Sequence, residues 1–198
     1  MLDLFSSKKT TLVYGKGGSG KTTLAMMLAR DTARRKQKTL FLDTEQSFSV
    51  ERFKQMAPED YEQLLDNILI IPIKSFREQQ DATNRLATLL KKGKFGLIVV
   101  DSLTRYYRTL VKNNQELANS MLKSQLRILK SLSKDIQVLL TTQVSSSLKE
   151  NKEKPTGGKF LDIANTIIYL QRDPRILANQ TIKEQFPFEI KDEGIVLL

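Results

Sequence analysis

The chain has 198 residues, about the size of one compact domain, and 40% of them are hydrophobic, which is enough to build a core. It contains no cysteine and no histidine, which excludes disulfides, thiolate metal sites and the commonest general base. Any catalysis must therefore use carboxylates, lysine, arginine, backbone N–H groups or a bound metal. The net charge of +10 fits a polyanionic partner such as nucleic acid and a lysine-rich solubilising surface equally well.

Short apolar runs predict strands, and capping residues followed by apolar residues at helical spacing predict helices. In chain order we predict a strand at 10–14, a helix at 21–36, a strand at 39–43, a helix capped by Ser49 that ends at 56, a strand at 67–71, a helix opened by the capping box 75–78 and ended by Gly93, a strand at 97–101, a helix at 117–133, a strand at 138–142, a polar loop at 145–158, a strand at 166–170 and weak strands at 188–190 and 195–198.

This alternation of strands and helices predicts one α/β domain over residues 1–198, with a mostly parallel central sheet flanked by helices on both faces. No apolar run is long enough to span a bilayer, and no signal-peptide pattern is present. We therefore expect a cytoplasmic protein with no membrane partner.

A phosphate-binding motif lies between the first predicted strand and the first predicted helix. Residues 15–22, GKGGSGKT, match G-x-x-x-x-G-K-[S/T] in full and in the required strand–loop–helix context. Glycines let backbone N–H groups turn toward phosphates, and the helix N-terminus adds its positive end. An accidental glycine-rich turn is the alternative. We predict ATP and Mg²⁺ as cofactors, held by Gly15, Lys16, Gly17, Gly18, Ser19, Gly20, Lys21, Thr22 and Thr23.

Within this motif, Lys21 is expected to reach the β- and γ-phosphates and Thr22 to ligate Mg²⁺. Asp101 ends the apolar run LIVV and is predicted to hold the same ion through water, although a simple turn residue is the alternative. Glu45 follows the strand that ends at Asp43, and the tip of that strand faces the same crevice. Glu45 is the best candidate to orient water, and spacing alone leaves a solvated loop carboxylate open.

Six further motifs, in register, resemble the RecA/RadA recombinase family, and most closely its short archaeal RadB branch. They are DTE at 43–45, VERF at 50–53, VDSLT at 100–104, YR at 107–108, TQV at 142–144 and PTGGK at 155–159. The resemblance extends over roughly residues 11–194. It implies a RecA-type P-loop NTPase fold. It also implies that Glu45 activates the attacking water, that Arg52 stacks on adenine and that Gln143 senses the γ-phosphate.

The resemblance also implies two DNA-binding loops, at 105–118 and 145–156, that contact single-stranded DNA. Neither loop has enough apolar residues to pack, so we expect both to be mobile without DNA. Tyr106 and Tyr107 are candidates to stack on bases, with a core contact as the alternative for Tyr107. The candidate phosphate contacts are Arg105, Arg108, Lys112, Lys149, Lys152 and Lys154.

The chain departs from the full recombinases of this family at several points. Nine residues precede Thr10, so no N-terminal DNA-binding domain is expected, and the Phe-x-x-Ala polymerisation motif is absent. Thr142 and Lys159 replace a common asparagine and histidine, and the proline-bearing ATP cap is missing. These departures favour a weakly hydrolysing accessory factor that works beside a recombinase or another recombination protein, and they put filament formation in doubt.

Two other classes fit part of the pattern. The segment KGGSGKT at 16–22 also matches the deviant Walker motif of ParA/MinD ATPases, in which the early lysine, here Lys16, reaches across a dimer. That class has no place for the DSLT, TQV and GG segments. A KaiC-like module would bind nucleotide and a protein partner but no DNA, and nucleic-acid binding measured against salt separates it from a DNA-binding ATPase.

Overall fold

The computed structural model describes residues 9–145 and 153–198, and within them nine strands form one sheet in the order β11-β10-β9-β8-β1-β5-β4-β2-β3. The strands from β3 to β8 in this order are parallel, and β8 to β11 pair antiparallel. Their bounds are β1 (Thr10–Tyr14), β2 (Lys38–Asp43), β3 (Ile68–Pro72), β4 (Phe95–Asp101), β5 (Gln137–Thr142), β8 (Thr166–Gln171), β9 (Ile176–Asn179), β10 (Glu184–Lys191) and β11 (Gly194–Leu197). A separate ribbon pairs β6 (Val144–Ser145) with β7 (Lys154–Pro155).

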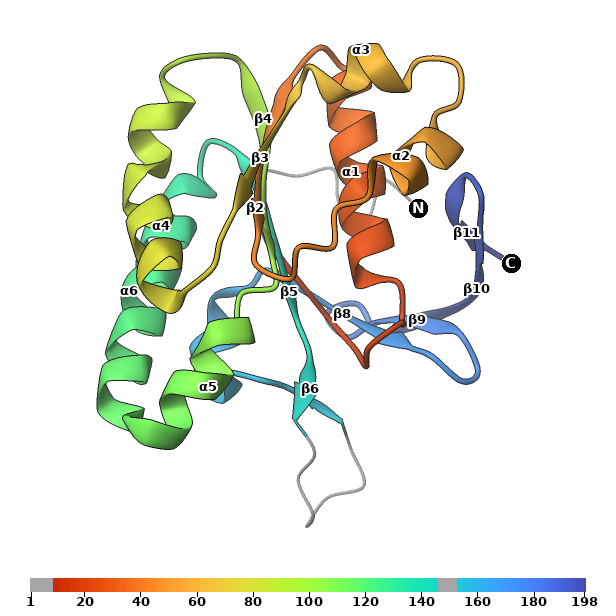
Figure 1. The fold of residues 1–198 in the computed structure, drawn as a ribbon. Helices are drawn as coiled ribbons and strands as arrows, with labels where there is room; N and C mark the ends of the chain where they lie inside the picture. Colours follow the sequence, from red (N-terminus) through yellow and green to blue (C-terminus); the bar gives the residue numbers. More distant parts are fainter. Residues whose placement is uncertain (1–8, 146–152) are drawn as a thin grey trace.

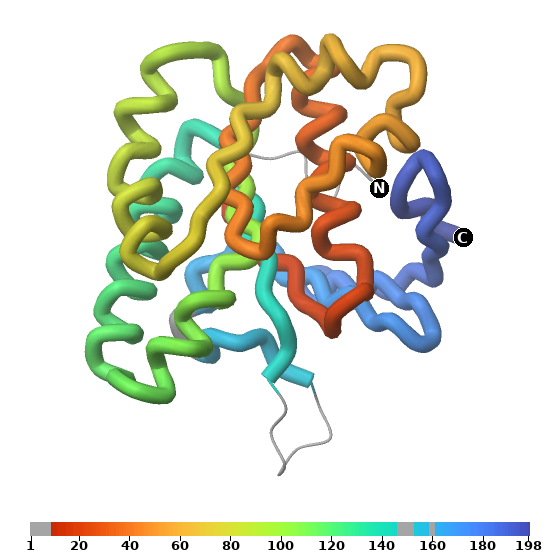
Figure 2. The backbone as a smooth tube through the Cα atoms, in the orientation of Figure 1, coloured from red at the N-terminus to blue at the C-terminus, as the bar shows by residue number. Residues whose placement is uncertain are grey.

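Helices cover both faces of the sheet, which confirms the predicted α/β class (Figure 1). One face carries α1 (Lys21–Arg34), α2 (Val50–Met56) and α3 (Tyr61–Leu65), and the other carries α4 (Phe76–Leu90), α5 (Arg105–Asn113) and α6 (Gln115–Leu132). A 3₁₀ helix, η2 (Gly158–Ile163), leads into β8. The C-terminal end of the sheet curves toward α1 and α2 (Figure 2), and β11 contacts α1.

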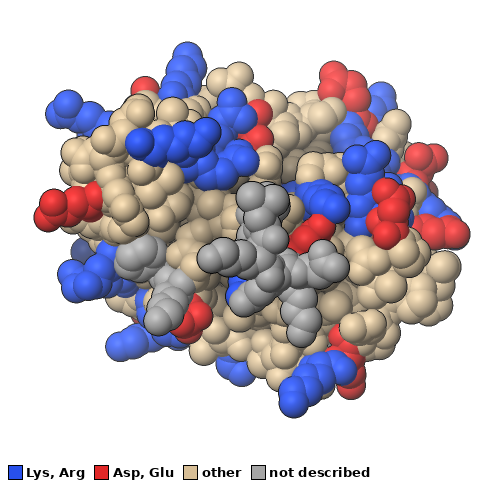
Figure 3. Space-filling view, turned by 90° about the horizontal axis from the view of Figure 1, so that it is seen from below, with Lys and Arg blue, Asp and Glu red and all other residues tan. Residues whose placement is uncertain are grey.

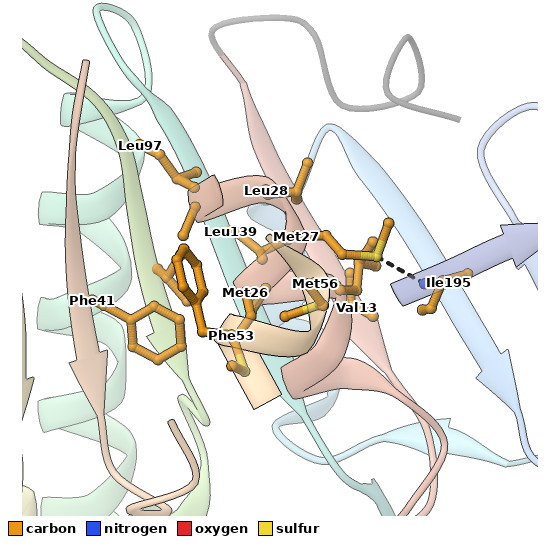
Figure 4. Packing of buried hydrophobic residues seen from close by; sticks show 14 of the residues in the cluster. Val13, Met26, Met27, Leu28, Phe41, Phe53, Met56, Leu97, Leu139 and Ile195 are labelled. Carbon is orange, nitrogen blue, oxygen red and sulfur yellow. Dashed lines mark hydrogen bonds between the residues drawn. The ribbon is translucent and has the colours of Figure 1, made fainter. Parts of the chain in front are cut away.

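Alternating strand residues build two cores, one on each face. In the central strands, Val13, Phe41 and Val99 face α1, while Leu12 and Leu42 face α4 to α6. The parallel strands are covered by helices on both faces. Alternate residues of a strand therefore meet helices on opposite faces, and the strand sequences are continuously apolar. The core on the α1 face, drawn in Figure 4, also includes Ile195, whose N–H donates to the sulfur of Met27 at 2.9 Å.

Capping residues begin the helices where the sequence predicts. The Ser49 hydroxyl accepts from the N–H of Arg52, and the Ser75 hydroxyl accepts from the N–H of Glu78. The Asn114 side chain accepts from the N–H of Leu117, so α6 begins two residues before its predicted start. The short helix α3 and strand β9 were not predicted, because their apolar stretches are too short to show a period.

The prediction of an unpacked loop at 105–118 is wrong. Arg105–Asn113 forms α5, and α6 follows after a single residue. Tyr107 is buried, its ring packs edge-on against Phe76, and its hydroxyl donates to the Asn119 side chain. The Tyr106 hydroxyl donates to the Ile73 carbonyl. Tyr107 is therefore a core contact and not an exposed base-stacking residue, and helical spacing of aromatic and aliphatic residues holds α5 in place without DNA.

Candidate functional site

The phosphate-binding motif forms a loop between β1 and α1, and helix α1 begins at Lys21. Gly18 has φ +72° and Gly20 φ +103°, a region that favours glycine. A Cβ on Gly15 would lie 2.3 Å from the carbonyl oxygen of Leu170, so only glycine fits there. The buried hydroxyl of Ser19 has no hydrogen-bond partner among the described residues. The loop thus combines an open helix N-terminus with an unsatisfied hydroxyl, and this arrangement fits a bound phosphate.

Lys21 closes this loop from within. Its ammonium group donates to the carbonyl oxygens of Gly15, at 2.9 Å, and Lys16, at 2.8 Å. Burial lowers the pKa of Lys21, and the nearby carboxylates of Asp101 and Glu45 oppose that shift. The ammonium is held by neutral carbonyls, and an anionic phosphate at this position would be a stronger acceptor than they are.

The candidate metal ligands from α1 and β4 lie in contact. The Thr22 hydroxyl donates to Oδ2 of Asp101 at 2.7 Å, although 79 residues separate the two. Oδ1 of Asp101 accepts from Thr141, and the Ser47 hydroxyl lies 3.4 Å from Oδ2. Burial raises the pKa of Asp101, and the neighbouring Asp43 raises it further.

These oxygen donors suit Mg²⁺, which at nucleotide sites takes one or two protein carboxylates together with phosphates and waters. The described residues contain no group of three His, Cys, Asp or Glu side chains that could cage a metal by themselves. Ser47 was missed from the sequence, because nothing in its local pattern marks it and only the contact with Asp101 reveals it.

Glu45 lies past the end of β2, in a turn held by hydrogen bonds to the turn after β4. The N–H of Thr44 donates to the Asp101 carbonyl at 2.7 Å, and the Thr44 hydroxyl bonds to the backbone of Ser102. Both carboxylate oxygens of Glu45 are engaged. Oε1 accepts from the Ser102 hydroxyl at 3.2 Å, and Oε2 forms an ion pair with Arg105 at 3.1 Å.

Gln143 joins the end of β5 to the β6–β7 ribbon. Its backbone carbonyl accepts from the N–H of Thr156, and its side-chain oxygen accepts from Arg108 at 2.7 Å. Arg108 lies close enough to Lys21 to lower the pKa of that lysine, and its own buried Nε has no partner among the described residues. The structure therefore places Gln143 and Arg108 beside the phosphate loop.

Two other motif residues have contacts away from the phosphate-binding loop. The Arg52 guanidinium donates to Gln55 and to the carbonyl of Lys191, which ties α2 to the end of β10. Stacking of Arg52 on adenine stays a prediction. Lys16 forms an ion pair with Glu153 of the same chain at 2.6 Å, and Glu153 also accepts from the hydroxyl of Tyr169.

The candidate DNA contacts divide into two groups. Arg105, Arg108 and Lys112 lie along α5, with Lys112 exposed near its end. Lys154 lies on β7, whereas Lys149 and Lys152 fall outside the described residues. Figure 3 shows the face of the molecule onto which the carboxyl ends of the parallel strands open, and lysine and arginine outnumber acidic side chains on it. Among the described residues, no helix is long and apolar enough to cross a membrane.

Comparison with known proteins agrees with this geometry. The chain is 37% identical over 178 residues to a protein from Methanococcoides burtonii described as "DNA repair and recombination protein RadB". The matched region covers 85% of this chain and 76% of the relative. RadB of Methanobrevibacter smithii is 32% identical over 94% of this chain and 86% of its own length, and RadB of Archaeoglobus fulgidus is 30% identical over 93% and 87%. The Rad51 family model matches residues 4–185, and the chain belongs to this family of RecA-type proteins.

Proposed function

We propose that this protein binds ATP with Mg²⁺ at residues 15–22, hydrolyses it slowly, and couples hydrolysis to single-stranded DNA as an accessory factor in DNA repair and recombination. The observation that carries the proposal is the contact between Thr22 and Asp101, with Lys21 and Glu45 at the same end of the sheet. It also draws on the names of the RadB relatives and on the net charge of +10. Family membership decides against the ParA/MinD interpretation.

Each residue has a defined part in this proposal. Lys21 would leave the loop carbonyls for the β- and γ-phosphates, and Thr22 and Asp101 would hold Mg²⁺. Bound Mg²⁺ supplies charge neutralisation at the phosphates. Glu45 orients the attacking water and accepts its proton, and Gln143 contacts the γ-phosphate. Because Arg108 bonds Gln143, the phosphate site communicates with α5 and with the ribbon that follows Gln143.

Two variants separate ATP binding from hydrolysis. Lys21→Ala should weaken ATP binding by roughly 10- to 150-fold, since a lost charge-assisted contact costs about 1.5–3 kcal/mol. Glu45→Gln should keep the affinity for ATP and lower the rate of phosphate release. The affinity is measured by calorimetry and the rate by a phosphate assay. Lys123→Ala, an exposed lysine on α6, is the charge-matched control for Lys21→Ala and should change neither quantity. Unchanged turnover in Glu45→Gln would remove Glu45 from the catalytic role.

The response to single-stranded DNA distinguishes the proposed DNA-stimulated ATPase from a KaiC-like module. In the proposed function, the wild-type protein hydrolyses ATP faster when single-stranded DNA is added, and the protein binds that DNA with a steep dependence on salt. A protein that binds ATP but neither binds DNA nor responds to it would instead be a KaiC-like nucleotide-gated module with a protein partner. The same titration in the presence of a recombinase of this family tests whether the two act together.

A further inference from the structure

Helix α5 contacts two of the residues proposed to act on ATP. Arg105 and Arg108 lie three positions apart, so they share one side of the helix. Arg105 pairs with Glu45, the candidate for water activation, and Arg108 donates to Gln143, the candidate γ-phosphate sensor. Among the described helices, only α5 has side chains that hydrogen-bond both of these residues. Three candidate DNA contacts also lie on α5.

The ion pair restrains Glu45 directly. A carboxylate that activates water must turn an oxygen toward that water and accept a hydrogen bond from it. Here the Ser102 hydroxyl lies on Oε1 at 3.2 Å and Arg105 on Oε2 at 3.1 Å. Release of Arg105 would leave Oε2 free while Ser102 still orients the carboxylate.

Both ends of the pair are attached to well-held backbone. The Tyr106 and Tyr107 hydroxyls anchor α5 to the Ile73 carbonyl and to Asn119. The turn that carries Glu45 is bonded to Asp101 through the Thr44 N–H. The motion that breaks the pair is therefore a change of side-chain conformation and does not require α5 to unfold.

The pair is also open to an anion from solvent. The Arg105 side chain is 42% exposed and that of Glu45 is 23% exposed. Ion pairs with this exposure contribute little to stability, whereas arginine binds phosphate oxygens in a bidentate, charge-assisted geometry. A nucleic-acid phosphate at α5 can thus replace the Glu45 carboxylate as the partner of Arg105.

We propose that Arg105 is a positioning residue that restrains Glu45 through their ion pair when no DNA is bound at α5. A backbone phosphate of single-stranded DNA then replaces Glu45 as the partner of Arg105, and Glu45 is free to orient water. This inference rests on the proposed ATPase and DNA-binding function. It assigns to Arg105 the step that makes hydrolysis depend on DNA.

The basal rate of ATP hydrolysis tests the restraint with no DNA present. Arg105→Gln should raise the DNA-free kcat roughly two- to five-fold, the factor that corresponds to a surface ion pair, and leave KM for ATP unchanged. The stimulation by DNA should shrink by the same factor. Arg105→Lys, which keeps the charge, should restore most of the restraint. Arg85→Gln, an exposed arginine on α4, is the matched control and should behave as wild type. A basal rate in Arg105→Gln at or below that of wild type overturns the proposal.

The reciprocal measurement uses DNA affinity and no hydrolysis. If DNA frees Glu45, then removing the Glu45 charge must free Arg105 for DNA, because coupling between two sites acts equally in both directions. Without nucleotide, Glu45→Gln should bind single-stranded DNA roughly two- to five-fold more tightly than wild type, a gain limited by the ion pair that it removes. In the Arg105→Gln background the same change should give no gain. Glu59→Gln, an exposed glutamate in the turn before α3, corrects for the change in net charge.

The outcomes separate this inference from the function on which it rests. Equal gains from Glu45→Gln in both backgrounds, with DNA binding intact, overturn only the role of Arg105. A wild-type protein that binds no single-stranded DNA overturns the release step together with the proposed DNA function. Hydrolysis that is absent in wild type and in Arg105→Gln alike overturns the restraint together with the proposed ATPase.

Discussion

At the carboxyl ends of the parallel strands, the arrangement of single residues that suits a ligand lowers the stability of the nucleotide-free protein. Asp101 is almost fully buried, and its nearest charged neighbours are Lys21 and a second carboxylate, Asp43. A buried carboxylate with incomplete compensation destabilises the folded state. Sites that bind highly charged ligands commonly accept such a penalty, because the ligand and its metal later supply the missing positive charge.

We therefore predict that Asp101→Asn stabilises the nucleotide-free protein. Burial raises the pKa of Asp101, so the folded protein binds that proton more tightly than the unfolded chain does. Wild-type stability attributable to this group should then fall as pH rises from the ordinary carboxyl value through the raised pKa. At neutral pH, Asp101→Asn should melt at a higher temperature than wild type, by roughly 2–4 °C for each kcal/mol that the substitution adds to the free energy of unfolding. This difference in melting temperature should shrink on acidification.

The same variant should lose most of the stabilisation that Mg²⁺ and ATP give to wild type, because the metal contact is gone. Thermal melts at several pH values, with and without nucleotide, measure both effects. Asp81→Asn, an exposed aspartate on α4, removes the same charge and should show neither. A lower melting temperature for Asp101→Asn at neutral pH would mean that the hydrogen bonds from Thr22 and Thr141 outweigh burial.

At the scale of elements, α5 differs most from its prediction. Its sequence, RYYRTLVKN, has two arginines and a lysine, and these suggested a polar loop. Tyr107 nonetheless lies against Phe76 and Asn119, and Leu110 and Val111 pack on the same core. The helix therefore presents its cations from a fixed scaffold, which is why Arg105 and Arg108 reach defined partners.

We predict that Tyr107→Ala lowers the free energy of unfolding by about 3 kcal/mol, the typical cost of removing a large buried aromatic ring. Tyr107→Phe should cost about 1 kcal/mol, because it loses only the hydrogen bond to Asn119. Urea denaturation followed by circular dichroism gives both values. Thr109→Ala, at an exposed position of the same helix, should stay within about 0.5 kcal/mol of wild type. A cost below about 1 kcal/mol for Tyr107→Ala would show that α5 adds little to the folded core.

At the scale of the whole molecule, many basic side chains lie at the end of the sheet where the parallel strands have their carboxyl ends. The parallel strands direct their carboxyl ends toward the phosphate loop, α5 and the β6–β7 ribbon, and the face seen in Figure 3 is rich in lysine and arginine. A net charge of +10 favours long-range attraction of polyanions, and the proposed partner, single-stranded DNA, is one of them. In the proposed function, the local positions of the cations would then decide which DNA phosphates are contacted.

We predict that replacing Lys149, Lys152 and Lys154 together by alanine flattens the salt dependence of single-stranded DNA binding. Each neutralised phosphate contributes roughly −0.7 to the log–log slope, so three lost contacts change the slope by about 2. Affinity for ATP should not change. Lys91, Lys92 and Lys94, changed together to alanine, remove the same charge at the opposite end of β4 and are the matched control. Equal slopes for the two triple variants would show that the loop at 145–156 does not contact DNA.

Much of the proposed nucleotide site could be predicted from local sequence. The motif 15–22 is contiguous, and its strand–loop–helix context can be seen in the apolar runs on either side. Asp101 and Glu45 were predicted because parallel strands carry functional side chains at their carboxyl ends. Backbone conformation and apolar periodicity depend mainly on neighbours along the chain, so the sequence by itself determined the α/β class, the phosphate-binding loop and the positions of most strands.

Contacts between distant residues were decided only by the tertiary structure. Arg105 and Glu45 are 60 residues apart, and Arg108 and Gln143 are 35 apart. These pairs meet because β4 lies between β2 and β5 in the sheet and because α5 packs against α6, and neither arrangement leaves a local pattern in the sequence. The sequence supplied candidates for water activation, phosphate sensing and DNA binding. Their direct connection through one helix depends on strand order and helix packing, which are set by long-range burial of apolar surface.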